Sequence, residues 1–95
     1  MSNRWHIPKE LEEKIRKRDK ICVYCHKVFG ENPKDRAEWE HIDNDENNIT
    51  KKNIALCCGS CNRSKGAKSL KEWLKSDYCN KHSISKSSLA FSISK

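Results

Sequence analysis

The sequence predicts a small α+β fold held together by a metal, and three observations favour this class. The chain has 95 residues, of which 35% are hydrophobic and 35% charged, so a purely apolar core would be marginal. Two Cys-x-x-Cys pairs supply the ligands for a metal staple. Helical patterns lie toward both ends of the chain, and short apolar segments of strand length lie between them.

The first expected element is a helix over residues 8–19. Pro8 suits a first helical position, and Leu11 and Ile15 fall four residues apart on one face. Acidic residues concentrate near its beginning and basic residues near its end, which is the order that the helix dipole favours. The next segment, 20–30, is β-prone and ends in a glycine turn.

Two short strands and a brief helix are expected in the middle of the chain. The apolar segments 39–42 and 54–57 predict the strands, and an Asn-rich loop separates them. Residues 59–65 predict a short helix that ends at Gly66, because glycine favours helix termination.

The C-terminal part predicts one further helix and then a tail. Ser69 followed by Glu72 fits a capping box, and the apolar stripe of Leu70, Trp73 and Leu74 continues the helix to about Asp77. Residues 1–82 are therefore expected to form a single domain. The serine-rich tail, 83–95, is expected to be a loose strand or disordered.

Charge is unevenly distributed along a chain of net charge +7. Residues 1–30 carry eight Lys or Arg against four Asp or Glu, residues 31–50 carry two against seven, and residues 51–95 carry ten against two. The basic flanks favour a polyanionic partner, and an acidic segment between them suits a hard divalent cation. The alternative is that the acidic side chains merely solvate a loop.

Several classes of protein are excluded by length and hydropathy. No apolar run is long enough to span a bilayer, and no apolar stretch near the N-terminus resembles a secretory signal. The length also excludes a large multidomain enzyme. A cytoplasmic protein without a membrane partner is expected.

Four cysteines have the spacing of a structural zinc site. Cys22 and Cys25 form one knuckle, and Cys58 and Cys61 form the second after 32 intervening residues. Four thiolates fill the tetrahedral shell of zinc, so this metal is expected to be structural and not catalytic.

The alternative is a set of three disulfides in a secreted protein, which would use all six cysteines. It is less favourable, because no signal segment is present and the adjacent Cys57 and Cys58 are awkward to pair. Cys57 is expected to be a small buried residue, and Cys79 has no knuckle partner.

The residues between and after the knuckles suggest hydrolytic chemistry. Glu40 and Asn62 offer oxygen ligands to Mg²⁺ or Mn²⁺, and His41 is a side chain that can take a proton from water. The amide of Asn53 can orient the imidazole or a backbone group. The alternatives are a structural histidine, a solvated acid and an amide that only begins a helix.

Together these motifs resemble the zinc-bound, four-cysteine branch of the HNH endonuclease family, whose catalytic unit is the ββα-metal fold. The resemblance spans residues 16–68. It is carried by Arg18-Asp19, Cys22-Val23-Tyr24-Cys25, Glu40-His41-Ile42, Asn53-Ile54 and Cys58-Gly59-Ser60-Cys61-Asn62-Arg63-Ser64-Lys65-Gly66. The sequence departs from the usual pattern in two places, with Glu40 where Asp is usual and Asn62 where many members have His.

The resemblance implies a metal-dependent DNA endonuclease with flanking N- and C-terminal helices, yielding 5′-phosphate and 3′-hydroxyl products. It implies that His41 is the general base, that Glu40 and Asn62 bind one catalytic Mg²⁺ or Mn²⁺, and that Asn53 orients the site. It also implies a structural zinc held by Cys22, Cys25, Cys58 and Cys61. A restriction or phage-type enzyme in a bacterial or phage context fits this pattern.

The expected partner is DNA, and double-stranded DNA in particular. Arg63, Lys65 and Lys68 follow the second knuckle and are candidates for phosphate contacts, although they would also suit a solvated helix face. A homodimer would address two half-sites. The alternative functions are a non-catalytic zinc-containing nucleic-acid-binding module and a protein-interaction zinc domain. Neither of them explains Glu40-His41 together with Asn62.

Overall fold

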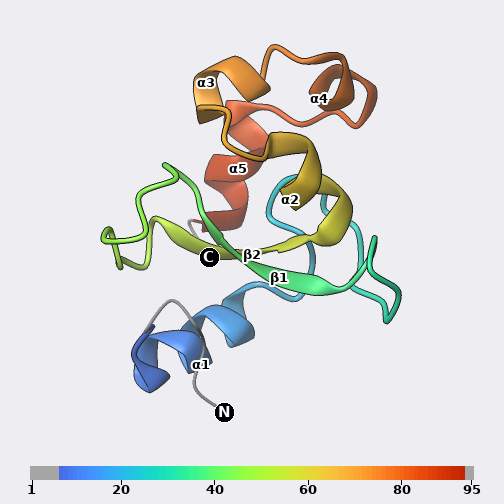
Figure 1. Ribbon diagram of the computed structural model, residues 1–95. Coiled ribbons are helices and arrows are strands. Elements are labelled where there is room, and N and C mark those ends of the chain that lie inside the picture. Colours follow the sequence, from blue (N-terminus) through green and yellow to red (C-terminus); the bar gives the residue numbers. More distant parts are fainter. Residues whose placement is uncertain (1–6, 94–95) are drawn as a thin grey trace.

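The computed structural model describes residues 7–93 and shows a two-stranded antiparallel sheet flanked by helices (Figure 1). The elements are α1 (Lys9–Arg18), β1 (Ala37–His41), β2 (Ile54–Cys58), α2 (Gly59–Lys65), α3 (Leu70–Trp73), α4 (Asp77–Lys81) and α5 (Lys86–Ile93). The mixed class and the helices at both ends agree with the sequence prediction. The parts of the predicted ranges that fall on residues 1–6 and 94–95 lie outside the described residues.

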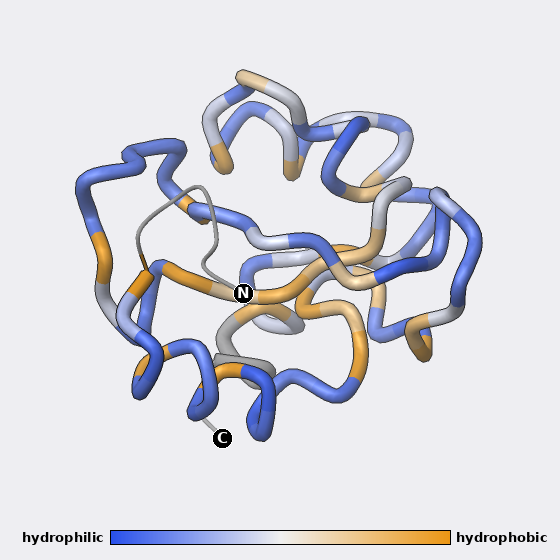
Figure 2. Tube along the Cα trace, turned by 60° about the horizontal axis from the view of Figure 1, so that its bottom comes forward, coloured by the Kyte–Doolittle hydropathy of each residue, from blue (hydrophilic) through white to orange (hydrophobic). Residues whose placement is uncertain are grey.

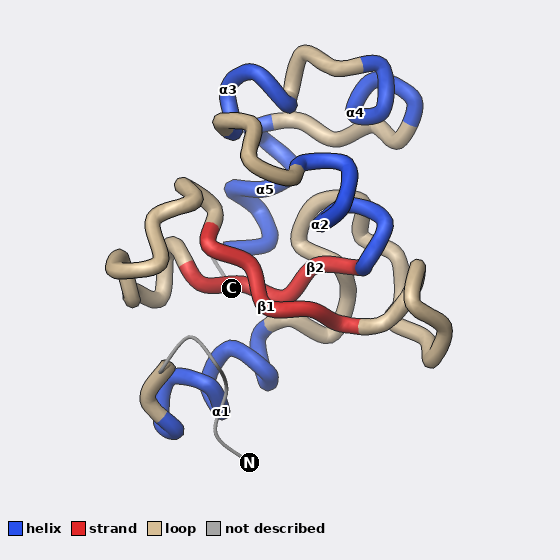
Figure 3. Tube along the Cα trace, in the orientation of Figure 1, coloured by secondary structure: helices blue, strands red, loops and turns tan. Residues whose placement is uncertain are grey.

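The two strands lie at the centre of the molecule, with α1 on one side and α2 to α5 on the other (Figure 3). β1 and β2 pair in a register that places Ala37 opposite Cys58 and His41 opposite Ile54. All five residues of β2 are buried, which explains why its sequence is a continuous apolar run.

β2 contributes side chains to two hydrophobic clusters, because successive strand residues point to opposite faces. Ile54 and Leu56 pack in one cluster with Ile15 of α1, whereas Ala55 belongs to the other cluster with Trp73 of α3. Hydrophobic residues accordingly gather along the central chain, and the outer loops are mostly hydrophilic (Figure 2). Within residues 7–93, no helix has the length and apolar character needed to cross a membrane.

A buried ion pair ties the end of α1 to β2. The Nε of Arg18 lies 2.7 Å from Oδ1 of Asp19, and both side chains are almost fully buried. Arg18 also donates to the carbonyl oxygens of Lys51 and Ile54, and Asp19 accepts from the backbone N–H of Leu56 at 3.1 Å. These contacts fix the position of β2 on α1.

Two glycines define the limits of α2. A Cβ atom at Gly59 would lie 1.8 Å from the carbonyl oxygen of Pro33, so only glycine allows the loop before β1 to cross the beginning of this helix. Gly66 ends the helix with a φ of 50°, as the sequence predicted.

The region after α2 differs from the prediction of one continuous helix. Ser69 caps the short α3 by accepting from the N–H of Glu72, as expected. The chain then leaves the helix, and Ser76 caps a second short helix, α4, by accepting from the N–H of Cys79. The predicted helix therefore ends at Trp73 and not at about Asp77, where the second helix, α4, begins.

Within the tail 83–95, the structure shows the helix α5 over Lys86–Ile93, in contrast to the loose strand or disorder expected from the serine-rich composition. Ser85 and Ser88 cap the beginning of α5 reciprocally, each hydroxyl accepting from the other's backbone N–H. Ile84 and Leu89 are buried in the larger cluster. The two capping serines and the two buried apolar side chains thus stabilise a helix that the serine-rich composition did not predict.

Candidate functional site

The four cysteines predicted to bind zinc lie together. Their Sγ atoms are all within 4.8 Å of one another, and three of the four side chains are buried. One pair comes from the turn after α1, whereas the second pair comes from the last residue of β2 and the first turn of α2. This thiol set and geometry fit a metal ion such as zinc. The four candidate ligands are Cys22, Cys25, Cys58 and Cys61.

The remaining two cysteines lie outside this cluster, and all six thiols are free. Cys57 is fully buried in the hydrophobic core, as predicted for a small apolar residue, and Cys79 is buried there as well. The structure therefore gives no support to disulfide pairing among the described residues.

The four thiols lie close enough to shift one another's pKa. A hydrogen bond from Cys22 holds the pKa of the Cys25 thiol below its usual range, whereas hydrogen bonds to Cys22 and Cys25 raise the pKa of Cys61. Without a cation, one thiolate is thus stabilised by neighbours that keep their protons. A divalent metal bound here would favour ionisation of all four thiols.

Aromatic residues of the C-terminal helices cover the cysteine cluster. The hydroxyl of Tyr78 lies 3.3 Å from Sγ of Cys61, and its ring stacks on Trp73 with the centroids 6.0 Å apart. Trp73 is itself fully buried and donates from Nε1 to the hydroxyl of Ser64. The helices after α2 therefore act as part of the structural support for the metal site.

A second feature is a pocket of about 380 Å³ beside β1 and α2. Three residues predicted from sequence to form a hydrolytic site, Glu40, His41 and Asn62, all line it. They are brought together because α2 packs across β1. The other lining residues are Trp39, Asn44, Glu46, Gly66 and Ala67.

Glu40 is held firmly by one of its two carboxylate oxygens. Its Oε2 accepts a hydrogen bond from the Tyr24 hydroxyl at 2.7 Å and lies 3.3 Å from Nζ of Lys65. Burial raises the pKa of Tyr24, and the nearby Glu40 charge raises it further, so the hydroxyl keeps its proton and remains a hydrogen-bond donor. Among the described residues, Oε1 of Glu40 has no hydrogen-bond partner.

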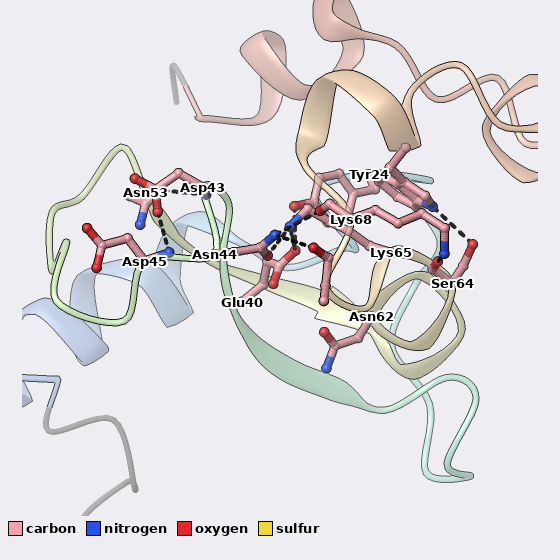
Figure 4. Close-up of polar contacts among 12 residues, drawn as sticks. Tyr24, Glu40, Asp43, Asn44, Asp45, Asn53, Asn62, Ser64, Lys65 and Lys68 are labelled. Atoms are coloured by element: carbon pink, nitrogen blue, oxygen red, sulfur yellow. Dashed lines mark hydrogen bonds and ion pairs between the residues drawn. The ribbon is translucent and has the colours of Figure 1, made fainter.

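Lys65 is an internal cation in this structure. Its side chain is fully buried, and its Nζ also donates to Oδ1 of Asn44 at 2.6 Å. Figure 4 shows Lys65 and Asn44 meeting beside Glu40. A direct contact between Lys65 and a DNA phosphate, as predicted from sequence, would require this side chain to leave its two partners.

We expect Lys65→Met to destabilise the protein by about 3–5 kcal/mol, because it leaves the buried Glu40 carboxylate without its counter-charge. The free energy of unfolding, measured by urea titration with zinc present, checks this. Lys71→Met is the matched control, since Lys71 is exposed.

A double variant separates the ion pair from general packing effects. Glu40→Gln together with Lys65→Met removes both charges, so it should cost less than the sum of the two single substitutions. Additive costs would contradict coupling between the two side chains.

Asn62 is held by an acidic residue that the sequence analysis did not select. Its Nδ2 donates to Oε1 of Glu38 at 2.8 Å, and Arg36 donates to the other oxygen of Glu38 at 3.0 Å. Partial burial opposes ionisation of Glu38, but the hydrogen bonds from Asn62 and Arg36 hold the pKa of its carboxyl below the ordinary value. Glu38 and Glu40 are two residues apart on β1 and therefore lie on the same face of the strand. This spacing is the feature of the sequence that could have indicated that both face α2.

Asn53 lies outside the pocket lining and holds the loop that follows His41. Its Oδ1 accepts from the backbone N–H of Asp43 at 2.9 Å (Figure 4). Its Nδ2 donates to the carbonyl oxygen of Asn48 at 3.0 Å. His41 itself is 7% exposed at the end of β1. Asn53 therefore closes the loop directly next to this histidine.

Arg63 and Lys68, the other two candidate phosphate contacts, are exposed. Arg63 donates to the carbonyl oxygen of Pro33 at 2.9 Å, and Lys68 donates to that of Ser64 at 3.1 Å. Both hydrogen-bond partners are neutral carbonyls, and both side chains are exposed cations.

No family model, no curated protein and no solved structure matches this chain. The site is therefore defined by its own geometry. Besides Glu38, the structure adds residues that sequence patterns did not single out, because their roles depend on contacts between distant segments. These residues are Tyr24, Asn44 and Tyr78.

Proposed function

We propose that this protein is a metal-dependent DNA endonuclease of the HNH type, built on a ββα-metal unit of β1, β2 and α2. The observation that carries the proposal is the joint position of Glu40, His41 and Asn62 around one pocket. The four-cysteine cluster supports it, because zinc there would brace the beginning of α2, on which Asn62 lies.

The residues present fit a catalytic Mg²⁺ or Mn²⁺. Hard divalent cations prefer carboxylate and amide oxygens, and Glu40 and Asn62 place one of each at the same pocket. Glu40 keeps Oε1 available, since Tyr24 and Lys65 both bind Oε2. When bound by these residues, the cation would stabilise the negative charge that develops on the phosphate and the leaving oxygen.

The chain's own residues supply the remaining parts of phosphodiester hydrolysis. His41 takes the proton from the attacking water, Tyr24 and Lys65 keep the Glu40 carboxylate in place, and Asn53 fixes the loop after His41. Because the imidazole generates the nucleophile, a single cation suffices. The expected products carry 5′-phosphate and 3′-hydroxyl ends.

The charge of the chain favours DNA as the substrate. A net charge of +7 attracts a polyanion, and Arg63 and Lys68 present exposed cations close to the pocket residue Asn62. We propose that these two side chains contact backbone phosphates and that double-stranded DNA is bound.

The direct test is cleavage of supercoiled plasmid by zinc-loaded protein with Mg²⁺ or Mn²⁺, compared with the protein in the absence of either metal. We expect conversion to open-circle or linear DNA only when the divalent cation is added. The form of the product distinguishes nicking from double-strand cleavage.

A non-catalytic zinc-containing nucleic-acid-binding module is the second candidate. It is favoured by the Lys65 ammonium, which already neutralises the Glu40 carboxylate beside the pocket. Folded protein that binds several unrelated DNAs but cuts none of them, in either metal, would replace the endonuclease with this module.

A further inference from the structure

The position of Asn62 depends on a second carboxylate, Glu38, which lies two residues before Glu40 on β1. The Nδ2 of Asn62 is 2.8 Å from Oε1 of Glu38. An ionised carboxylate only accepts hydrogen bonds, so it must face the amide nitrogen of Asn62 and not the oxygen. The contact therefore fixes which end of the amide points away from Glu38.

This orientation matters because Asn62 also lines the pocket with Glu40 and His41. An asparagine offers a hard cation only its oxygen, and a freely rotating amide would present nitrogen as readily as oxygen. Because Glu38 accepts the hydrogen bond from Nδ2 of Asn62, Oδ1 remains as the atom that can bind a cation in the pocket. Tyr24 and Lys65 do the equivalent for Glu40, since both bind Oε2 and leave Oε1.

Resting on the proposed function, we infer that Glu38 is a positioning residue for the catalytic cation: it acts through Asn62 by directing the amide oxygen into the pocket. It does not bind the cation itself, because Glu38 is not one of the residues that line the pocket. Partners of metal ligands of this kind typically change metal affinity by about 10–100-fold.

Mn²⁺ alone, without DNA, provides the probe. The side-chain amide signals of Asn62 are followed by NMR in zinc-loaded protein while Mn²⁺ is added, because a paramagnetic ion broadens the signals of nearby nuclei. We expect broadening of Asn62 in the wild-type protein. In Glu38→Ala, the same broadening should require about 10–100-fold more Mn²⁺.

Three further variants make the result specific. Glu38→Gln keeps an acceptor for the Asn62 nitrogen and should bind Mn²⁺ within a few-fold of the wild type. Arg36→Ala removes the other partner of Glu38 and should leave Mn²⁺ binding unchanged. Glu31→Ala removes an exposed acidic charge elsewhere and controls for net charge. Circular dichroism and zinc content establish that each variant is folded.

Equal Mn²⁺ affinity in Glu38→Ala and wild type would overturn the inference. So would a loss in Glu38→Gln as large as in Glu38→Ala, because that would make the carboxylate a direct ligand. Plasmid cleavage measured on the same samples tests the proposed function separately. A wild-type protein that cuts DNA without broadening of Asn62 would refute the role of Glu38 alone.

Discussion

Removal of the metal from the four-cysteine site is expected to unfold the protein. Structural zinc contributes about 10–16 kcal/mol in small zinc-binding peptides, whereas the whole stability of a small protein is about 5–15 kcal/mol. Here the ligands join the turn after α1 to the junction of β2 and α2, and three of the four cysteines are buried. Without the metal, the bonds that join these two segments are lost, and four closely spaced thiols remain in their place.

Far-UV circular dichroism during chelation of zinc measures this unfolding, and refolding on zinc addition establishes that it is reversible. Cys58→Ser and Cys57→Ser form a matched pair, because the residues are adjacent and both buried but only Cys58 belongs to the cluster. We expect Cys58→Ser to lose zinc and Cys57→Ser to retain one zinc per chain. A metal-free protein that still unfolds cooperatively would contradict this role.

His41→Ala is expected to lower DNA cleavage by about 10²–10⁴-fold, the usual contribution of a general base. DNA affinity should be unchanged, because His41 is only 7% exposed at the end of β1 and offers little surface to the DNA. Single-turnover cleavage of plasmid and fluorescence anisotropy with labelled duplex DNA separate the two effects.

Two further variants support the interpretation of His41. His41→Gln keeps a polar side chain of similar size, so it loses the proton acceptor with less disturbance of β1. His82→Ala is the control, because His82 packs against Tyr78 near the cysteine cluster, with the ring centroids 4.3 Å apart, and is not part of the pocket lining. Cleavage by His41→Ala at the wild-type rate would rule out this histidine as the base.

The sequence predicted the elements whose local signals agree with their burial. Leu11 and Ile15 share a helical face, and Ile15 is fully buried against β2. Gly66 ended α2 as expected. Two Cys-x-x-Cys pairs were sufficient to predict the metal cluster, because the required ligand number and spacing leave few alternatives.

Contacts between distant segments could not be predicted in this way. Lysine is usually a surface residue, and only the position of Lys65 opposite Glu40 and Asn44 explains its complete burial. Glu38 has no motif of its own, and its contact with Asn62 depends on how α2 crosses β1. The tail gave a misleading signal, since serine-rich composition concealed the reciprocal caps at the beginning of α5.

The cysteine cluster takes two of its four residues from each half of the chain. The exposed segment 43–47 separates one half, which carries α1, β1 and the first cysteine pair, from another that carries β2, the second pair and the remaining helices. A single peptide-bond cut in this segment would leave one strand and two metal ligands on each fragment. Reassembly of the fragments would then be governed by zinc concentration, so the protein has the layout of a metal-controlled split protein.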